Sequence, residues 1–347
     1  LRSKGHDVPY GWAESLRGEP DRPAEDSLAN FLTDRFLGWL DRQDAGWFAH
    51  LSYLRPHPPY AAAGEWSTRY DPDAVALPIA PVAADQRHEL HEFALGYRRS
   101  AAPTDEAAMR RVIAQYLGMV SEVDAALGRV VGAIEARGEW DDTLVVVTAD
   151  HGDQLGDHGL IEKLGFFPQS YHIIGLWRDP RRTARGVVVD RFTENVDLMP
   201  TLAEALGLEV PAQCDGRPLG ALLDGADAPW RDHAHSEWDF RGGELVSQPT
   251  RRDVDWTLAT NNLCVSVGEE LAYVQFGDGS WLAFDLAADA TWRTPCLDVD
   301  RVLAAAREQL VWRQTHLRRD YTDMLLRPGR PGRWPTVPAS PRLRQPA

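Results

Sequence analysis

The stretch "TLVVVTADHGDQLGDHG" (residues 143–159) decides the fold, because an apolar run passes without a spacer into two histidines and three aspartates. Desolvating a charge at the end of a buried strand is costly unless the charge is paired or binds a metal ion. The stretch therefore predicts a strand over 143–148 and a metal site at its end, with Asp150 and His151 as candidate ligands. A hard oxygen beside a borderline nitrogen suits Mn²⁺, Zn²⁺ or iron, and less typically Ca²⁺ or Mg²⁺.

A long amphipathic helix is predicted before this strand, from Thr104 as its N-cap to Gly138 as its stop. Its apolar stripe recurs at helical spacing: Val112, Ile113, Tyr116, Leu117, Val120, Val123, Leu127, Val130, Val131 and Ile134. Further upstream, "GWFAHLSYL" (46–54) is read as another strand. Strand, helix and strand form the repeating unit of a parallel sheet covered by helices. The chain is therefore expected to have an α/β core.

Functional groups gather where the strands of an open parallel sheet end. The strand at 46–54 runs into "RPHPPY", which places His57 just past its end, so His57 is expected at the same edge as Asp150 and His151. Prolines on both sides of His57 would hold its imidazole in one direction. Two ligands alone do not complete a metal site.

Each candidate also has a plain structural interpretation. Asp150 and His151 would serve equally well as a loop cap and a hydrogen-bonded histidine, and His57 as a surface residue of a proline-rich loop. Lys163 taken alone would be a solvated charge, and His50 is expected in the core. Three other polar residues are expected to support the ligands from behind: Asp153, Asp157 and His158.

The remaining chain predicts one large and one smaller domain. Around the core we expect helices at 27–41 and 198–206 and strands at 173–177 and 186–190. Short alternating runs at 263–267, 271–276 and 281–286 predict an antiparallel sheet, with a helix at 299–318 packed on it. The expected domains are 1–210 for the α/β core, 211–325 for a smaller α+β domain and 326–347 for an extended Pro/Arg-rich tail.

Composition limits the partners. The formal net charge of −15 argues against a nucleic acid or an anionic membrane, so an anionic substrate would need a local positive field. No apolar run reaches the length of a membrane span. The three cysteines are widely spaced and indicate neither a disulfide framework nor a zinc ribbon. The compartment stays open, with the cytoplasm favoured over the periplasm.

Taken together, several motifs resemble the sulfatase and phosphonate monoester hydrolase group of the alkaline phosphatase superfamily. They are "SYLRPHPPY" (52–60), "LVVVTADHGDQLGDHGLIEKLGFF" (144–167) and "FTENVDLMPTLAEALGLEVPAQCDGRPLGALL" (192–223). The resemblance implies an alkaline phosphatase-like α/β sandwich with a smaller C-terminal α+β domain. It implies Asp150 and His151 as metal ligands, and His57 and Lys163 as catalytic contacts to the anionic group and its leaving oxygen.

By this resemblance we expect a metal-dependent hydrolase of phosphonate or phosphate esters, with a small anionic ester as substrate. Hydrolysis of aryl or alkyl sulfates is the close alternative, and a non-catalytic remnant that needs a partner chain is the alternative of another class. One divalent metal ion is expected, Mn²⁺ or Ca²⁺ before Zn²⁺ or Mg²⁺. A homo-oligomer through the C-terminal tail is left open.

The chain departs from the group's pattern in three places. "HIIGLW" (172–177) stands where members often have Arg-x-Pro, and "TPCLD" (294–298) where they have Asn-Leu-Ala. Paired aspartates and a C/S-x-P-x-R nucleophile motif, whose Cys or Ser becomes formylglycine in most members, are not found, and Cys214 lacks that context. We therefore expect this chain to be the C-terminal two thirds of such an enzyme, inactive by itself.

Overall fold

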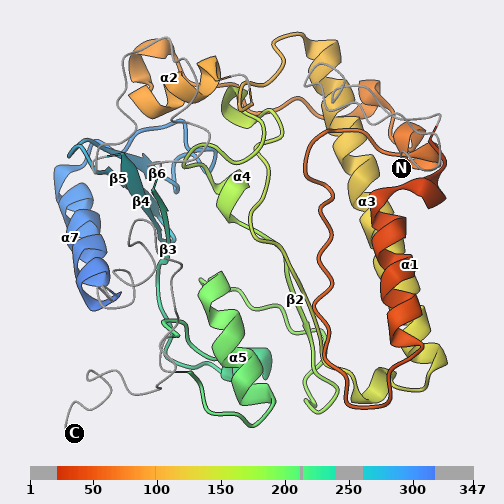
Figure 1. Cartoon of the computed structure of the whole chain (residues 1–347). Coiled ribbons are helices and arrows are strands. Elements are labelled where there is room, and N and C mark those ends of the chain that lie inside the picture. Colours follow the sequence, from red (N-terminus) through yellow and green to blue (C-terminus); the bar gives the residue numbers. More distant parts are fainter. Residues whose placement is uncertain (1–21, 98, 212–213, 240–260, 317–347) are drawn as a thin grey trace, which may run out of the picture. The chain divides into compact units, whose positions relative to one another are not determined.

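The structure is a computed structural model that describes residues 22–97, 99–211, 214–239 and 261–316 (Figure 1). The chain separates into two compact units, Leu1–Pro180 with Thr250–Arg252, and Arg181–Pro249 with Asp253–Ala347. Each unit is described by itself, and the domain boundary expected at residue 210 stays a prediction. No helix in the described ranges has the length and apolar character needed to cross a membrane.

The predicted helices of the first unit are present, with a small change at one cap. Helix α1 (Leu28–Leu40) begins after Ser27, whose hydroxyl accepts a hydrogen bond from the Asn30 amide at 3.1 Å, as predicted. Helix α3 (Glu106–Ala136) begins after Asp105 instead of Thr104, because the Asp105 carboxylate accepts the Ala108 amide at 2.8 Å. A carboxylate at that position also interacts favourably with the helix dipole.

Helices α1 and α3 lie side by side (Figure 1). The Arg129 guanidinium of α3 donates to Asp34 at 2.5 Å and to Asn30 at 2.7 Å on α1. The shorter helices of this unit are α2 (Glu89–Gly96) and α4 (Pro168–Tyr171). Single 3₁₀ turns occur at Ala24–Asp26, Gly64–Thr68, Pro72–Ala74, Ala84–Gln86, Trp140–Asp142 and Asp157–Gly159.

The strand predictions for this unit are only partly right. Strand β1 (Val145–Thr148) is present, but it pairs antiparallel with β2 (Gly175–Arg178), with Val145 opposite Arg178. In the described part of this unit, residues 46–54 form no strand, so the prediction of a parallel strand, helix and strand unit was wrong; residues 186–190, which lie in the second unit, form no strand either. An extended run becomes a strand only where a neighbour receives its backbone hydrogen bonds. His50 is exposed on this run and is not the core residue that was predicted.

The core of the first unit joins α3 to the two segments that carry His57 and Lys163. Tyr60 and Ile161, both fully buried, pack in one cluster with the inner face of α3. The other buried members of the cluster are Ala62, Met109, Val112, Ile113 and Met119. Burial of these apolar side chains therefore also fixes where the two polar segments meet.

The second unit contains the predicted antiparallel sheet. Its strand order is β3 (Ala234–Asp239), β4 (Asn262–Val267), β5 (Leu271–Phe276) and β6 (Trp281–Asp285), each antiparallel to the next. Helix α7 (Val299–His316) packs on this sheet over a core of Tyr273, Ala283, Cys296 and Val302. The unit also contains a 3₁₀ helix at Asn195–Asp197 and the helices α5 (Leu198–Ala205) and α6 (Gly220–Leu223), and α5 ends near the positive φ of Gly207 as predicted.

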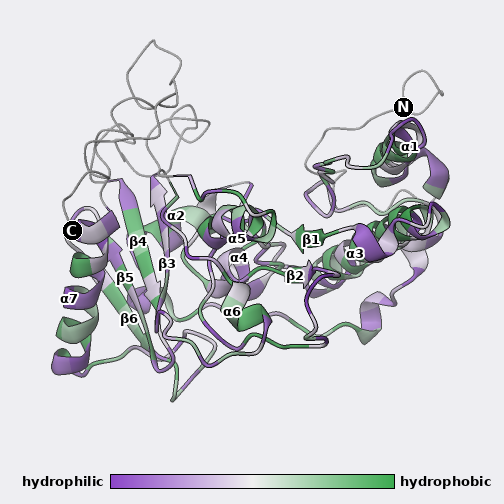
Figure 2. Ribbon diagram, turned by 90° about the horizontal axis from the view of Figure 1, so that it is seen from below, coloured by the Kyte–Doolittle hydropathy of each residue, from purple (hydrophilic) through white to green (hydrophobic). Residues whose placement is uncertain are grey.

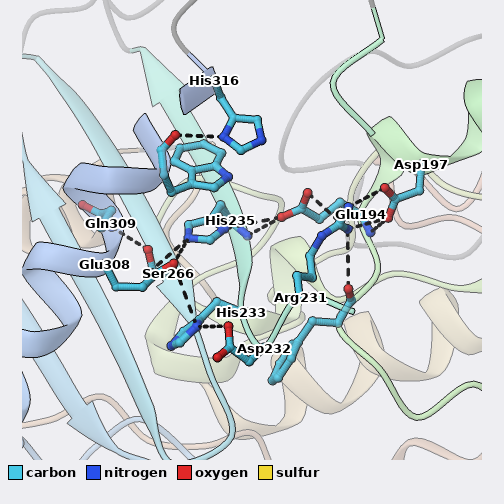
Figure 3. Close-up of polar contacts among 12 residues, drawn as sticks. Glu194, Asp197, Arg231, Asp232, His233, His235, Ser266, Glu308, Gln309 and His316 are labelled. Atoms are coloured by element: carbon cyan, nitrogen blue, oxygen red, sulfur yellow. Dashed lines mark hydrogen bonds and ion pairs between the residues drawn. The ribbon is translucent and has the colours of Figure 1, made fainter. Parts of the chain in front are cut away.

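Polar contacts hold the unpredicted strand β3 in place (Figure 3). Hydrophilic and hydrophobic residues alternate along α7, which packs near it (Figure 2). The His235 imidazole stacks on Trp312 of α7 with ring centres 4.2 Å apart, and its Nε2 lies 3.3 Å from the Glu308 carboxylate. Arg231, just before β3, binds the fully buried Asp197 through two hydrogen bonds of 2.5 and 2.6 Å. Buried polar groups need such partners, so these contacts join β3 to α7 and to Asp197.

We predict that Gly118→Ala destabilises the protein although alanine is the better helix former. A Cβ at residue 118 would overlap the Trp66 carbonyl oxygen and lie 3.1 Å from the Ala62 Cβ. The expected loss of unfolding free energy is about 1–3 kcal/mol, typical of overpacking. Gly128→Ala is the matched control on the same helix, because nothing lies within 4 Å of its added Cβ. It should gain up to about 1 kcal/mol. Urea unfolding measures both, and equal shifts in the two variants would contradict the close approach at Gly118.

Candidate functional site

Asp150 and His151 lie directly after β1, as the sequence predicts. The Asp150 side chain is 88% exposed, and its Oδ1 accepts the His151 amide at 3.0 Å. The His151 Nδ1 lies 2.8 Å from the Gly152 carbonyl oxygen, which can only accept, so Nδ1 carries the proton. Nε2, on the other side of the ring, then carries a lone pair, and this nitrogen lies 3.6 Å from the Asp150 Oδ2. The two residues therefore present one carboxylate oxygen and one imidazole nitrogen close together.

The loop after His151 runs tightly against α4. The Gly152 amide donates to the Ser170 carbonyl at 2.9 Å, and a Cβ at residue 152 would overlap the Gln169 carbonyl oxygen. Only glycine permits this approach without moving the backbone. Glycine at position 152 thus lets the loop turn immediately behind the two candidate ligands.

His57 lies in a turn that its neighbours hold rigidly. Its backbone amide donates to the Leu54 carbonyl at 3.0 Å, and its Nδ1 lies 2.7 Å from the Pro58 carbonyl oxygen. The Arg55 guanidinium donates to the carbonyls of His57 and Pro59. As in His151, the ring donates through Nδ1 to the next carbonyl, which leaves Nε2 for other contacts. The sequence predicted such a fixed imidazole from the surrounding prolines.

A buried hydrogen-bond cluster joins the His57 turn to the loop that follows β1. The Tyr60 hydroxyl donates to the Asp153 carboxylate at 2.8 Å. The same carboxylate accepts the backbone amides of Leu155 at 2.8 Å and Glu162 at 3.1 Å. Burial raises the pKa of the Tyr60 hydroxyl and of the Asp153 carboxyl. Asp153 therefore connects both segments through internal contacts.

The pKa of Glu162 is influenced by charges from both candidate segments. Glu162, the residue before Lys163, is half-buried, and burial raises the pKa of its side chain. The positive charges of His57 and Lys163 oppose that shift, so both side chains lie within electrostatic reach of Glu162. Their roles in catalysis stay predictions, as do those of Asp150 and His151 in metal binding.

Sequence reasoning did not single out Glu162. Its carboxylate has no regular spacing to a histidine or aspartate, and its neighbour Lys163 drew the attention instead. The structure shows that Glu162 has a φ of +59°, a left-handed conformation that non-glycine residues rarely adopt. Such a conformation is invisible in composition or periodicity.

The other polar residues of the loop build its shape. Asp157 accepts the Ile79 amide at 2.7 Å and the Gln169 side-chain amide at 2.9 Å. The His158 ring is buried and stacks on Phe167 with ring centres 3.6 Å apart. These contacts fix the loop's own conformation, and the expected support of Asp150 and His151 by these residues stays a prediction.

The donor set fits a divalent metal ion in part. An exposed carboxylate and an imidazole with a free Nε2 lone pair are the ligand types that Mn²⁺ and Zn²⁺ accept. Metal sites need at least four ligands, however. Across the described ranges, no group of three or more His, Cys, Asp or Glu side chains is arranged to hold a metal ion. Asp150 and His151 by themselves therefore offer only two ligand positions, and their role in metal binding stays a prediction.

Comparison with known proteins identifies the family. A family model described as Sulfatase matches residues 4–208. The multifunctional alkaline phosphatase superfamily protein PehA of Trinickia caryophylli is 35% identical over 333 residues, which cover 89% of this chain and 64% of that protein. An arylsulfatase of Clostridium perfringens is 25% identical over 237 residues, 67% of this chain and 47% of that protein. The chain thus spans less than two thirds of the length of these relatives.

Solved structures agree with this result. The phosphonate monoester hydrolase SpPMH of Silicibacter pomeroyi superposes with a TM-score of 0.78 and 30% identity, covering 94% of this chain and 69% of that one. The phosphonate monoester hydrolase of Agrobacterium radiobacter gives a TM-score of 0.77 and 33% identity, covering 91% and 68%. These likenesses confirm the alkaline phosphatase-like fold inferred from the motifs. The chain belongs to the sulfatase family.

Proposed function

We propose that this chain carries part of the active site of a metal-dependent hydrolase that cleaves phosphonate or phosphate esters. The supporting observation is the cluster of Tyr60, Asp153 and Glu162, which joins the segments of His57, Lys163 and the Asp150–His151 pair. The likeness to two phosphonate monoester hydrolases over more than nine tenths of the chain supports the substrate class. The substrate is a small anionic ester.

In this proposal the local charges oppose the net charge of −15. Hydrolysis of such an ester gathers negative charge on the non-bridging and leaving oxygens. The Lys163 ammonium and, in the imidazolium form of His57, its Nε2–H donate to those oxygens, and stabilise the transition state more than the ground state. A divalent metal ion held by Asp150 and His151 with further ligands, Mn²⁺ or Ca²⁺ before Zn²⁺ or Mg²⁺, supplies Lewis-acid charge stabilisation when bound.

The proposed nucleophile is a formylglycine in a segment upstream of this chain. The chain alone would then contain the groups that stabilise charge but no group that attacks, and should not turn over. The test is hydrolysis of aryl phosphonate, phosphodiester and sulfate esters with added Mn²⁺ or Ca²⁺, by the chain alone and by the product of the full upstream reading frame. Comparable turnover by both forms would contradict the proposed upstream nucleophile.

Sulfate ester hydrolysis is the second candidate. It is favoured by the similarity to the C. perfringens arylsulfatase across 67% of this chain. Sulfate and phosphonate esters are both tetrahedral anions, so the same cations serve both. The assay above separates the candidates by the ratio of kcat/KM for the two esters. Loss of all turnover in the extended form as well would favour a non-catalytic chain that acts with a partner.

Asp150→Ala should remove most of the bound metal and most of the activity from the extended form. Losing one anionic ligand leaves the cation short of a charge and of a coordination position. Elemental analysis of the purified protein measures the metal. Asp141→Ala is the control, because this aspartate has a 98% exposed side chain near the other end of β1. An unchanged metal content in Asp150→Ala would exclude Asp150 from the site.

His57→Ala and Lys163→Ala should keep their metal but slow turnover by on the order of 10²-fold each, the effect of removing one donor to a developing oxyanion. Both groups are proposed to act on the ester and not on the ion. His50→Ala serves as the control, since His50 is an exposed histidine on the neighbouring segment. Normal turnover by both site variants would show that His57 and Lys163 do not contact the reacting group.

A further inference from the structure

The turn that carries His57, residues 55–59, has few backbone groups that can donate a hydrogen bond. Prolines occupy positions 56, 58 and 59, and a proline has no N–H group. The His57 amide donates to the Leu54 carbonyl at 3.0 Å, and the Ala61 amide donates to the Pro59 carbonyl at 2.8 Å. Backbone carbonyls taken out of water need partners, so a turn of this composition depends on donors from side chains.

Arg55 supplies such donors from within the turn. Its Nη1 donates to the His57 carbonyl at 3.2 Å and also to the Pro59 carbonyl. The same nitrogen lies 3.2 Å from the Sδ of Met119, a fully buried residue of α3. The guanidinium is therefore placed against the core of the unit, and it fixes the two peptide groups that it binds.

The carbonyl between these two peptide groups receives the His57 ring. The His57 Nδ1 lies 2.7 Å from the Pro58 carbonyl oxygen. Each peptide group is planar, so this carbonyl can turn only by rotation at the residues on either side of it. The proline rings at 58 and 59 fix φ but not ψ, and the two bonds from Arg55 supply the remaining constraint. The direction of the His57 Nε2 is thus coupled to Arg55.

We propose that Arg55 is a positioning residue for His57: by binding the carbonyls of His57 and Pro59, it holds the Pro58 carbonyl where the His57 ring donates to it. This inference rests on the proposed function, because it concerns the aim of His57 at the ester. In this role Arg55 acts through the backbone of the turn and not on the ester. A misplacement of about 1 Å of a group at the reacting centre can cost on the order of 10²-fold in rate.

The experiment is a double-mutant cycle in the extended form, with kcat/KM for an aryl phosphonate ester as the measured quantity. Arg55→Met removes the donors and keeps a long side chain beside Met119. It should slow the wild type by roughly tenfold or more, the effect of a loosened donor. In the His57→Ala background it should change the rate by less than about threefold, because the group that it positions is already gone.

Arg55→Lys is the second variant, which covers the case in which Arg55→Met does not fold. An ammonium group donates to carbonyls but lacks the planar fork of the guanidinium. The expected loss is roughly fivefold in the wild type, smaller than for Arg55→Met, and it too should disappear in the His57→Ala background.

Arg137→Met is the matched control, because Arg137 also donates to two backbone carbonyls, Leu40 at 3.0 Å and Gln43 at 2.8 Å, at the C-terminal end of α3. It should lower the urea midpoint but leave kcat/KM within about twofold in both backgrounds, as expected for a site without a shared partner.

Equal slowing by the Arg55 variants in both backgrounds would show that Arg55 acts on the ester or on the fold independently of His57, and this overturns the inference alone. Unchanged turnover of a folded Arg55→Met protein overturns it as well. Normal turnover by His57→Ala overturns the proposed role of His57 and the inference with it. A wild type that hydrolyses none of the esters tested above overturns the proposed function itself.

Discussion

The buried hydrogen bond between the Tyr60 hydroxyl and the Asp153 carboxylate is the contact on which the candidate site depends. Tyr60 and Asp153 are far apart in sequence, and the 2.8 Å bond fixes the segment after His57 against the loop after β1. A buried carboxylate needs several donors, and Asp153 obtains the others from the amides of Leu155 and Glu162. Loss of the Tyr60 hydroxyl would leave that carboxylate short of a donor. The hydrogen bond therefore favours the folded arrangement in which the two segments lie together.

Apolar packing places this contact. The Tyr60 ring and Ile161 are buried with the inner face of α3, so the hydrophobic effect favours the arrangement that holds the two segments together. The close approach at Gly118 allows α3 to reach the Gly64–Thr68 turn and this cluster. Stability and site geometry thus share the same residues, which explains why the loop tolerates positive φ at Leu155, His158 and Glu162.

The proposed charges of the site differ from those of the chain. A protein of net charge −15 repels anions at long range, whereas the residues proposed to bind the ester, His57 and Lys163, carry or can carry positive charge. Binding of an anionic ester would therefore depend on short-range contacts that salt screens only weakly.

The sequence by itself determined the elements that local spacing defines. Caps and apolar stripes located α1, α3, α5 and α7, alternating runs located β4 to β6, and the combined motifs identified the family and the four candidate site residues. Only the tertiary structure decided that residues 46–54 form no described strand, that β1 pairs antiparallel with β2, and that Asp153 and Glu162 join the two site segments. The reason is that strand pairing and buried polar contacts require partners distant in the chain, and no local pattern specifies which partner is reached.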